Sequence, residues 1–573
     1  MSTALFYSIF SVAVILSPQL TVTAQPSAAV CDTTWSNENA SAAVNAQWYN
    51  ANACAVATAQ WNNASWRSDQ VGAMQNANWE NSSCSIYIIT NSSCNQGSVP
   101  ILAVNATWPE HVQTTVEFAS ANNLRLVIKT TGHDYLGRST AADSLLLWLH
   151  YMKNMTFMEN FTTCDGSNLS NAIRVGAGVQ WGQVYAWLTQ YNLTAIGGAA
   201  STVCAAGGYL QGGGHSPLSR WKGMAADQVL EFDVIMANGQ RQTVNACQNT
   251  DLFWALRGGG GGTFAIVLSV VLRTYPSPPL VVGLYSITAS NGTTYSSLIH
   301  NFIGYLPTLA DRGWAGYFNM KDTNLVISFI QPYGKLTEAY AILPYLLTNN
   351  TDSQINYNFT TAAPSFYDFF IQVLAPGNPT GYNVLLGSRL IPETIVRNQS
   401  YQLAETFLQA NGLSQTGSTL LGHLVAGGQV SNVSSTNNNS VNPVWRTSLL
   451  HMVFAVTWPD EISESLLQEI PAYVRSQVAI LQTMAGGSQS GCYLNEADPN
   501  ELNWQQKFFG TQANYDRLKS IKQTADPLGL FVCKDCVGSD DWSSDLNCLL
   551  TSSATKVGVT IMFAIIEVVV LAH

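Results

Sequence analysis

Charge is scarce in this chain. Its 24 Lys and Arg residues and 35 Asp and Glu residues make up 10% of 573 residues and leave a net charge of −11, whereas soluble domains carry roughly 25% charged residues. No run of Lys or Arg occurs. Because nucleic-acid binding needs a basic surface, we exclude nucleic acid as a partner.

Signature motifs of several enzyme classes are also missing. The chain has no G-x-S-x-G motif, which weakens a hydrolase interpretation, and no repeat of solenoid length. The eight His residues show no metal-ligand spacing, and Cys533 and Cys536 form a lone C-x-x-C. We therefore expect no metal site and a structural disulfide at that pair. Paired carboxylates of a glycosidase cannot be located from the pattern, so this chemistry stays open.

The N-terminus has the features of a secretory signal. An apolar stretch from Leu5 to Ile15 precedes the small-residue sequence Val22-Thr23-Ala24, which predicts cleavage before Gln25. A buried first helix is the alternative. Export agrees with the many Asn-x-Ser/Thr sequons and with the 11 Cys residues. Two of these, Cys84 and Cys94, have a spacing typical of a local loop. We expect a secreted glycoprotein with disulfides and at least one unpaired thiol.

The C-terminus ends in an apolar tail. Val557 to Ala572 is shorter than the roughly 20 residues of a membrane-spanning helix and contains Glu567. Small residues at Ser543-Ser544 followed by a polar stretch and this tail are typical of a GPI-attachment signal. A retained membrane-associated tail and an ordinary terminal element are the alternatives.

Strand and helix patterns alternate from Ser98 onwards, after an irregular segment rich in Asn, Ala, Ser and Trp. The periodicity predicts a βαβ unit first, and then further strands and helices up to a proline cluster that we take as a domain boundary. Longer strands and helices follow it, such as 325–331 and 336–347. The predicted elements are strands at 100–104, 124–128, 173–178, 229–236 and 264–272, helices at 109–121, 181–188 and 251–257, and the boundary at 276–279.

The turn from Thr130 to Arg138 is the most informative stretch. It follows the apolar strand 124–128 and presents His133 beside small residues whose backbone N–H groups can face an anion. Glycine-rich stretches at 207–214 and 258–262 come later. The second stretch follows a helix and opens a strand, which is the reverse of a Rossmann fingerprint, and the first lacks the Lys-Ser/Thr of a P-loop. Backbones that approach a ligand this closely indicate a large, flat cofactor.

These motifs resemble those of the vanillyl-alcohol-oxidase/berberine-bridge-enzyme superfamily, and the secreted fungal isoamyl-alcohol-oxidase-like branch is the most similar. Val127 to Ser139 is similar to the flavin-linkage loop. The resemblance covers roughly residues 96–545, and five further blocks keep the family's order, namely Gly207-Gly208 with Gly212–Gly214, Asp251–Phe264, Tyr493–Asp498, Asn514–Leu518 and Asp526–Phe531.

The resemblance implies an α+β fold. A two-subdomain PCMH-type FAD-binding domain would be roofed by a substrate domain of antiparallel sheet covered by helices. The implied boundaries are a signal peptide at 1–24, a cysteine-containing N-terminal segment at 25–95, the FAD domain at 96–278, the substrate-binding domain at 279–490, a C-terminal segment returning to the FAD domain at 491–545 and the hydrophobic tail at 546–573.

Carried over by position, His133 would bond covalently to the 8α-methyl of FAD, and Lys129 to Asp134 would contact the pyrophosphate. A noncovalent FAD with His133 only hydrogen-bonded is the alternative. The residues that the resemblance implies around the cofactor are Lys129, Thr130, Thr131, Gly132, His133, Asp134, Ser139, Ser201, Cys204, Gly207, Gly208, Gly214, Asp227, Val229 and Asn495.

Two departures from the family pattern matter. Many relatives carry a second flavin link through a Cys at the position of Ser201, so we expect attachment through His133 alone. Cys204 stands where relatives control oxygen access with Val, Leu or Ile, and its small side chain should leave room for O2. A shifted register that makes Cys204 a second link is the alternative.

The resemblance places Tyr493 near the flavin as a catalytic base and Asn495 beside it as a hydrogen-bonding residue. A free Tyr has a pKa of about 10, so this role needs a neighbour that lowers it; simple aromatic packing is the alternative.

We expect a monomeric, secreted oxidase that acts on a small-molecule alcohol with O2 as acceptor. The alternatives are an oligosaccharide oxidase, a secondary-metabolite cyclase or dehydrogenase, and a surface-anchored flavoprotein without turnover.

Overall fold

The computed structural model describes residues 22–24, 51–80, 97–348, 350, 352–377, 380–410, 417–433 and 438–550. The predictions for the signal peptide (except 22–24), for a loop between Cys84 and Cys94, and for the tail from 551 lie outside these residues. Between 51 and 80 the expectation of an irregular segment is wrong. The chain there forms the helices α3 (Ala51–Gln60), α4 (Ala64–Ser68) and η2 (Ala77–Glu80), and the Asn63 side chain caps α4 by accepting from two backbone N–H groups.

The predicted βαβ unit is confirmed and contributes the first sheet. The helix occupies the predicted residues, because Pro109 suits its first turn and Val112, Val116 and Ala119 face the core at helical spacing. Strands β2 and β3 both run parallel to β4, which lies between them, and β1 pairs with β2. The elements are β1 (Val22–Ala24), β2 (Leu102–Asn105), α5 (Pro109–Ala121), β3 (Leu126–Lys129) and β4 (Leu145–Trp148).

The second sheet is antiparallel with strand order β5-β6-β10-β8-β9. The turn at Asn238-Gly239 joins β8 to β9 as a hairpin, with Gly239 at φ +79°. Its elements and the connections around it are β5 (Met155–Thr162), β6 (Asn168–Gly176), α6 (Trp181–Leu188), η4 (Thr189–Tyr191), β7 (Leu193–Thr194), α7 (Gly208–Gln211), α8 (Ser219–Lys222), η5 (Ala225–Gln228), β8 (Val229–Ile235), β9 (Arg241–Asn245), α9 (Thr250–Ala255), β10 (Ile266–Arg273) and β11 (Tyr275–Pro276).

The third sheet begins directly after the proline cluster. It has the order β15-β12-β14-β13-β17-β18-β16 and is antiparallel throughout. Its strands are β12 (Leu280–Thr288), β13 (Ala315–Lys321), β14 (Asn324–Pro332), β15 (Gln354–Ala363), β16 (Asn383–Pro392), β17 (Gly417–Leu424) and β18 (Ser448–Trp458). An antiparallel sheet covered by helices was expected for the substrate domain, and this α+β architecture is confirmed.

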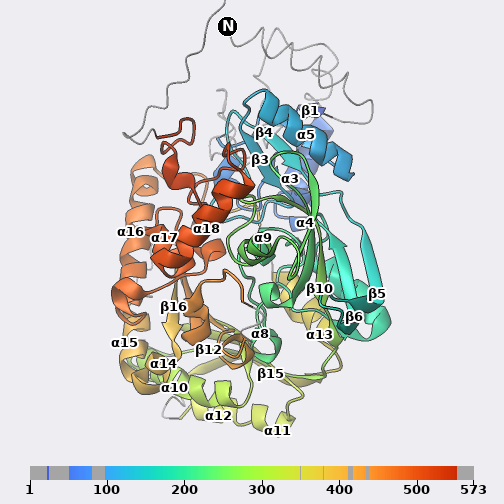
Figure 1. The fold of residues 1–573 in the computed structure, drawn as a ribbon. Coiled ribbons are helices and arrows are strands. Elements are labelled where there is room, and N and C mark those ends of the chain that lie inside the picture. The colour runs from blue at the N-terminus through green and yellow to red at the C-terminus, as the bar shows by residue number, and fades with distance from the viewer. Residues whose placement is uncertain are drawn as a thin grey trace, which may run out of the picture.

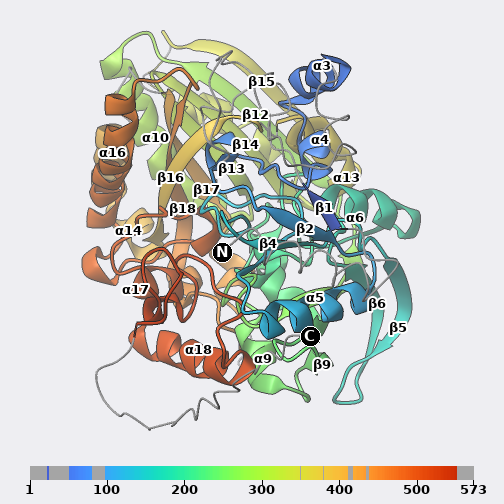
Figure 2. The ribbon, with the colours of Figure 1, turned by 90° about the horizontal axis from the view of Figure 1, so that it is seen from above.

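Helices cover one face of the third sheet, as Figures 1 and 2 show for α10 and α16. The predicted helix 336–347 is divided in two, because the ring of Pro344 clashes with a continuous helix at the carbonyl of Tyr340. The helical elements of this region are α10 (Gly292–Asp311), α11 (Leu336–Ala339), α12 (Ile342–Leu346), α13 (Phe366–Phe369), η6 (Phe370–Leu374), η7 (Ala375–Gly377), α14 (Glu393–Asn398), α15 (Ser400–Ala410), η8 (Gly428–Val430), η10 (Pro443–Thr447) and α16 (Glu464–Thr483).

Strand alternation separates the two faces of this sheet. On β18, Leu450, Met452 and Phe454 pack against the covering helices. Val453 and Ala455 point the other way and contact Tyr135, which lies in the turn that presents His133. Because side chains alternate along a strand, the face opposite the helices looks towards the first two sheets.

The C-terminal segment returns across the molecule and places α18 beside α9 (Figures 1 and 2). Its elements are η11 (Gly487–Gln489), η12 (Leu494–Glu496), α17 (Trp504–Phe509), α18 (Gln512–Ala525) and η13 (Ser539–Asp541). The expected disulfide Cys533–Cys536 is confirmed, and a second joins Cys164 to Cys247. Among the described residues, no helix has the length and apolar character needed to cross a membrane.

Candidate functional site

The turn after β3 is held in shape by its own side chains. Gly132 has φ +78°, a conformation that L-residues rarely adopt. The Asp134 carboxylate accepts hydrogen bonds from the backbone N–H groups of Leu136 and Ser139 and from the Arg138 guanidinium. Asp134 therefore fixes the loop on either side of His133.

The imidazole of His133 contacts the segment that precedes α7. Its Nε2 lies 2.6 Å from the hydroxyl oxygen of Thr202. Burial lowers the pKa of His133 to about 4, yet its side chain keeps part of its surface accessible. The imidazole is therefore neutral at physiological pH, and part of its surface is accessible to a ligand. Thr202 was missed in the sequence, where nothing distinguishes it from other Thr residues.

The predicted residues on the second segment gather beside this turn. The Cys204 thiol is buried, hydrogen-bonds the side chains of Thr130 and Thr131, and has a pKa raised by that burial. A Cβ atom on Gly207 would lie 3.3 Å from both Cys204 Cβ and Thr130 Oγ1. The carbonyl of Ser201 accepts from the Gly182 N–H at the start of α6. His133, Thr130, Thr131, Cys204 and Gly207 are thus neighbours in space.

Lys129 has a different environment from the one expected for a pyrophosphate contact. Its ammonium group is buried and donates to the carbonyls of Gln70, Val71 and Ala73. Desolvation lowers the pKa of Lys129 to about 7. Its polar contacts therefore hold the segment 70–73, between α4 and η2, against β3. Among the described residues, the Lys129 ammonium makes no polar contact on the His133 side of the turn.

The glycine stretches have two separate roles. A side chain at Gly208 would meet nothing within 4 Å, so its backbone faces open space. A Cβ on Gly258 would instead lie 2.1 Å from the Val441 backbone N, and one on Gly261 would lie 2.8 Å from the Gly208 Cα. The sequence-based interpretation of both stretches as ligand-facing stays a prediction at Gly208, where space is open, but is wrong at Gly258 and Gly261, which approach protein backbone.

Asn495 and Tyr493 join the C-terminal segment to these loops. The Asn495 amide donates to the Tyr493 hydroxyl at 2.8 Å and to the Gly208 carbonyl at 3.0 Å, while its carbonyl oxygen accepts from Arg138 at 3.1 Å. A Cβ on Gly212 would lie 2.5 Å from the Asn495 amide nitrogen, so only glycine leaves room for it. The predicted pair therefore adjoins the turn that carries His133.

The environment of Tyr493 does not favour a phenolate. Burial and the nearby Glu496 carboxylate raise the pKa of Tyr493, and the opposing influence of Asn495 is smaller. The condition that a catalytic Tyr base requires, a lowered pKa, is not provided by the described residues. Tyr493 as the base stays a prediction.

Two predicted cofactor residues lie apart from this network. The Asp227 carboxylate forms an ion pair with Arg446 at 2.8 Å, and also bonds Asn439 and the Met224 N–H. Arg446 lies in η10, the turn that leads directly into β18, so the pair links η5 to the third sheet. Val229 is buried at the start of β8. Their role towards FAD stays a prediction.

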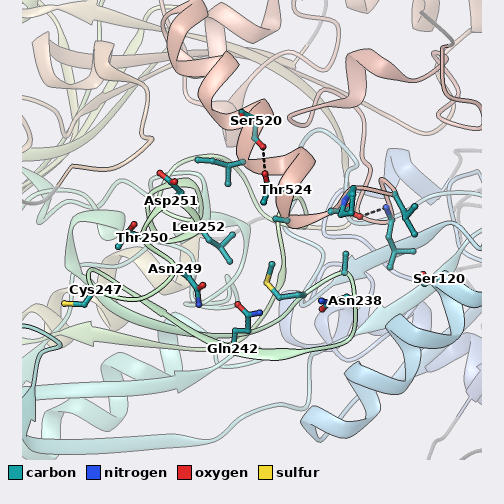
Figure 3. A pocket seen from close by; sticks show the side chains of 18 residues that line it. Ser120, Asn238, Gln242, Cys247, Asn249, Thr250, Asp251, Leu252, Ser520 and Thr524 are labelled. Atoms are coloured by element: carbon teal, nitrogen blue, oxygen red, sulfur yellow. Dashed lines mark hydrogen bonds between the residues drawn. The ribbon is translucent and has the colours of Figure 1, made fainter. Parts of the chain in front are cut away.

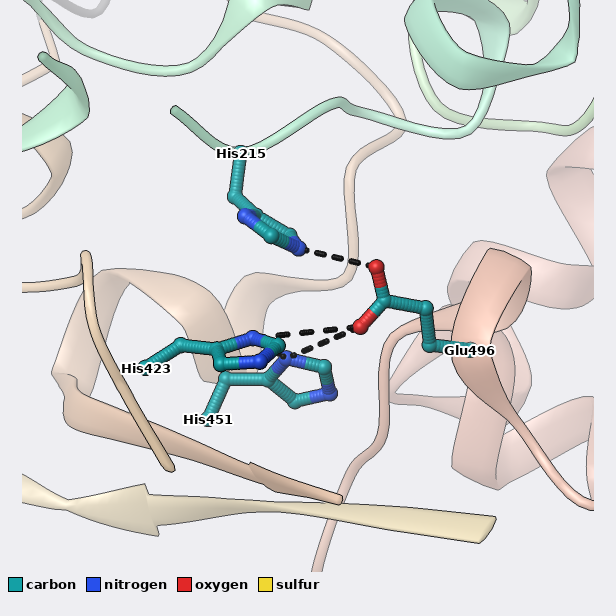
Figure 4. A group of neighbouring side chains, drawn as sticks. All are labelled: His215, His423, His451 and Glu496. Atoms are coloured by element: carbon teal, nitrogen blue, oxygen red, sulfur yellow. Dashed lines mark hydrogen bonds and ion pairs between the residues drawn. The ribbon is translucent and has the colours of Figure 1, made fainter. Parts of the chain in front are cut away.

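A cluster of three histidines and one carboxylate lies where three distant segments meet (Figure 4). Its members, called the three-histidine cluster below, are His215, His423, His451 and Glu496. His423 and His451 are direct cross-strand partners on β17 and β18, so both point to the face that looks away from the helices. His215 follows Gly214, at φ +70°, and Glu496 ends η12.

Electrostatics and packing make this cluster distinctive. His215 Nε2 lies 3.0 Å from Glu496 Oε1. Although desolvation acts in the opposite direction, the three imidazoles together hold the pKa of Glu496 well below its usual range. The ring of Tyr493 lies 5.3 Å from that of His215. Sequence reasoning missed the cluster because its members are 28 or more positions apart, and only the strand register pairs two of them.

A cleft of about 820 Å³ lies on another part of the molecule, between α9, the β8–β9 hairpin and α18 (Figure 3). Asp251, Leu252 and Thr524 are among its lining residues. None of the predicted cofactor residues lines it, so it is separate from the His133 site.

The described residues fit a flat cofactor. An accessible but desolvated imidazole, an open backbone at Gly208 and the polar groups of Asn495 and Arg138 form adjoining parts of one site. Residues 100–245 match the FAD binding domain family, and residues 492–537 match the berberine and berberine-like family.

Curated relatives and solved structures agree with these family matches. An uncharacterized FAD-linked oxidoreductase of Arthroderma benhamiae is 37% identical over 82% of each chain. The FAD-linked oxidoreductase patO of Aspergillus clavatus is 33% identical over 80% of this chain and 79% of its own. The VAO-type flavoprotein MtVAO615 of Myceliophthora thermophila C1 is 29% identical, covers 91% of this chain and 93% of its own, and superposes with a TM-score of 0.80. A glucooligosaccharide oxidase of Acremonium strictum, at 19% identity and a TM-score of 0.66 over 85% of this chain and 98% of its own, shares the fold. The chain is an FAD-linked oxidoreductase and belongs to the vanillyl-alcohol-oxidase/berberine-bridge-enzyme superfamily.

Proposed function

We propose that this oxidoreductase is an oxidase for small-molecule alcohols. When bound, FAD supplies the hydride acceptor for a substrate CH–OH group, and O2 then takes up the electrons as H2O2. The observation that carries the proposal is the position of the neutral His133 beside Thr202, Cys204 and the open backbone at Gly208. The small Cys204 side chain, at the position that relatives fill with larger residues, supports access for O2.

We further propose that His133 alone holds FAD covalently. A neutral imidazole has a free ring nitrogen that can act as the nucleophile, and the low pKa of about 4 keeps His133 in this form. The glucooligosaccharide oxidase of Acremonium strictum carries a 6-S-cysteinyl, 8α-N1-histidyl FAD. This chain has a hydroxyl at Ser201, where a cysteine would stand, so it lacks the second nucleophile.

The substrate class rests on the family resemblance, which favours small or secondary-metabolite alcohols. Sugar oligomers are the second candidate, because several structures with this fold carry the names of oligosaccharide oxidases. Secretion, N-glycosylation and surface attachment through a GPI anchor, as well as a monomeric state, are further parts of the proposal that rest on the sequence patterns alone.

Acid precipitation of the purified protein tests the flavin link. We expect flavin absorption to stay with the precipitated wild-type chain and to be lost with His133→Ala, while Cys204→Ala keeps it. Flavin that still precipitated with denatured His133→Ala protein would contradict covalent attachment through His133 alone. Loss of covalent flavin in Cys204→Ala, with the protein folded and able to bind FAD, would favour the shifted register with Cys204 as a link.

Peroxide release tests the oxidase assignment. The purified holoenzyme is assayed under air with a panel of alcohols and sugar oligomers, and in parallel with a dye acceptor without oxygen. Peroxide formed with an alcohol supports the proposal. Turnover with the dye but not with O2 would make the protein a dehydrogenase, and no turnover with either acceptor would favour a binding flavoprotein.

A substitution at Tyr493 tests the predicted base. If the phenol accepts the substrate proton, Tyr493→Phe should lower kcat by about 100-fold or more, the usual contribution of general-base catalysis. The Asn495→Asp variant is less informative, since Asn495 also bonds Gly208 and Arg138. An unchanged kcat in Tyr493→Phe would show that the base lies elsewhere.

A further inference from the structure

We propose that the three-histidine cluster binds a divalent transition-metal ion, with Zn²⁺ the best match to its three nitrogen donors and one oxygen donor. The proposal revises the sequence-based expectation of no metal. It does not depend on the flavin chemistry proposed above, because the donor atoms all belong to protein side chains.

The donor geometry is the first argument. In a tetrahedral Zn²⁺ site with bonds of about 2.0–2.1 Å, neighbouring ligand atoms lie about 3.3 Å apart. Here His215 Nε2 lies 3.0 Å from Glu496 Oε1, and His451 Nδ1 lies 3.6 Å from Glu496 Oε2. His423 Nδ1 lies 3.8 Å from the same Oε2 and 3.1 Å from His451 Nδ1. The four donor atoms, one from each residue, lie within 4.8 Å of one another.

Burial and charge are the second argument. The side chain of His451 is fully buried, and those of His215 and His423 are exposed by only 9% and 11%. The Glu496 carboxylate, exposed by 20%, carries a negative charge into this environment. A desolvated carboxylate requires a cationic partner or a shared proton. A divalent ion supplies that charge and accepts all four donors at once.

The facing nitrogens are the third argument. His423 and His451 turn the same ring atom, Nδ1, towards each other and towards Glu496 (Figure 4). The outer nitrogens, His215 Nδ1 and His451 Nε2, are buried without a hydrogen-bond partner in the described part of the chain. The nitrogens that face one another across the cluster are thus the ones available to a metal, which would bind their lone pairs.

The scaffold is the fourth argument. Strand register places Tyr317, His423 and His451 in one row across β13, β17 and β18. The loop after α7 supplies His215, and the C-terminal segment supplies Glu496. A bound ion would therefore hold the third sheet and the C-terminal segment against the flavin domain, beside Tyr493. Four protein ligands are typical of a site whose role is structural.

Elemental analysis of the intact, flavin-containing protein, purified without a histidine tag, tests the proposal. We expect about one transition-metal ion per chain. After chelation, Zn²⁺ should bind again with similar stoichiometry by calorimetry and should raise the melting temperature. The flavin spectrum before and after chelation checks that the fold is kept.

Two variants make the test specific. Glu496→Gln keeps the shape of the side chain but removes its charge, and should weaken Zn²⁺ binding by about tenfold or more. His300→Gln is the matched control, because His300 and Glu405 form a His–Glu pair with Nε2 and Oε1 2.6 Å apart on the surface of α10 and α15. The control should keep its full metal content.

Three results would overturn the proposal. These are a metal-free purified protein that also fails to bind added Zn²⁺, Mn²⁺ or Cu²⁺, full metal content in folded Glu496→Gln, and equal metal loss in Glu496→Gln and His300→Gln. A metal-free protein whose activity profile with pH still shifts in Glu496→Gln would identify the cluster as a carboxylate sharing a proton with its histidines.

Discussion

The Thr202 hydroxyl, 2.6 Å from His133 Nε2, is a hydrogen-bond partner of one of the two ring nitrogens. If Nε2–H donates to Thr202, the Nδ1 lone pair is available to attack the flavin. We predict that Thr202→Val, which removes the hydroxyl at nearly constant volume, slows covalent flavin incorporation by about fivefold, the equivalent of one net hydrogen bond of about 1 kcal/mol. The measurement follows acid-stable flavin over time after FAD is added to apoprotein. Thr202→Ser should behave like the wild type, and equal rates for Val and wild type would show that this bond has no role in the linkage.

Individual residues also show which parts of the site could be predicted from the sequence. The His133 turn could be recognised because its residues are contiguous, and the same is true of the Tyr493-Leu494-Asn495 stretch. Thr202, the Lys129 contacts and the three-histidine cluster could not, because each depends on a partner brought close only by folding. Lys129 illustrates the limit well. Its position in the motif predicts a ligand contact, but its length and buried surroundings direct the ammonium to the carbonyls of the N-terminal segment.

At the scale of elements, α18 is fastened to the flavin domain by a buried lysine. Lys522 donates to the carbonyls of Thr263 and Phe531 and forms an ion pair with Asp526, whose side chain is fully buried. We predict that Lys522→Met destabilises the protein by about 3 kcal/mol, because it leaves a buried carboxylate without its cation. Denaturant unfolding of both proteins checks the value. Lys519→Met removes a more exposed ion pair from the same helix and should cost less than about 1 kcal/mol; equal losses would contradict the reasoning.

Periodicity and apolar runs predicted different kinds of element. Helix α5 occupies its predicted residues because its buried apolar side chains recur at helical spacing and face one core. Strands β3, β8 and β14 lie close to their predicted positions because each is a short run rich in buried apolar residues. The pentaglycine stretch was misread for a physical reason. Glycine is required wherever any atom comes close, and a sequence does not reveal whether that atom belongs to a cofactor or, as at Gly258, to the backbone of Val441.

At the scale of the whole molecule, the sequence could predict an FAD domain and a roofing sheet, but not how the parts join. The three larger sheets meet through side chains contributed in small numbers by each, such as the Asp227–Arg446 pair and Tyr135 against β18. Such contacts leave no periodic signal. The N-terminal helices are a further example, since they are joined to the first sheet by Lys129 and by the His150–Asp69 pair, with Nε2 and Oδ1 2.7 Å apart.

That last pair predicts how the whole fold responds to acid. His150 stacks on Trp148 with ring centroids 5.3 Å apart, and burial lowers its pKa to about 4 even though Asp69 acts in the opposite direction. In the unfolded chain a histidine titrates near a pKa of about 6.5. The unfolded state therefore binds more protons between these two values, so stability falls as the pH decreases through this window. We predict that the free energy of unfolding of His150→Asn, which cannot be protonated, falls by about 1 kcal/mol less than that of the wild type between about pH 7 and pH 5. The measurement is the shift of the denaturant midpoint of each holoenzyme between these two pH values. Asn can still donate to Asp69, so the comparison separates proton uptake from the loss of the hydrogen bond. Parallel pH profiles for the two proteins would show that His150 does not govern the acid sensitivity of the fold.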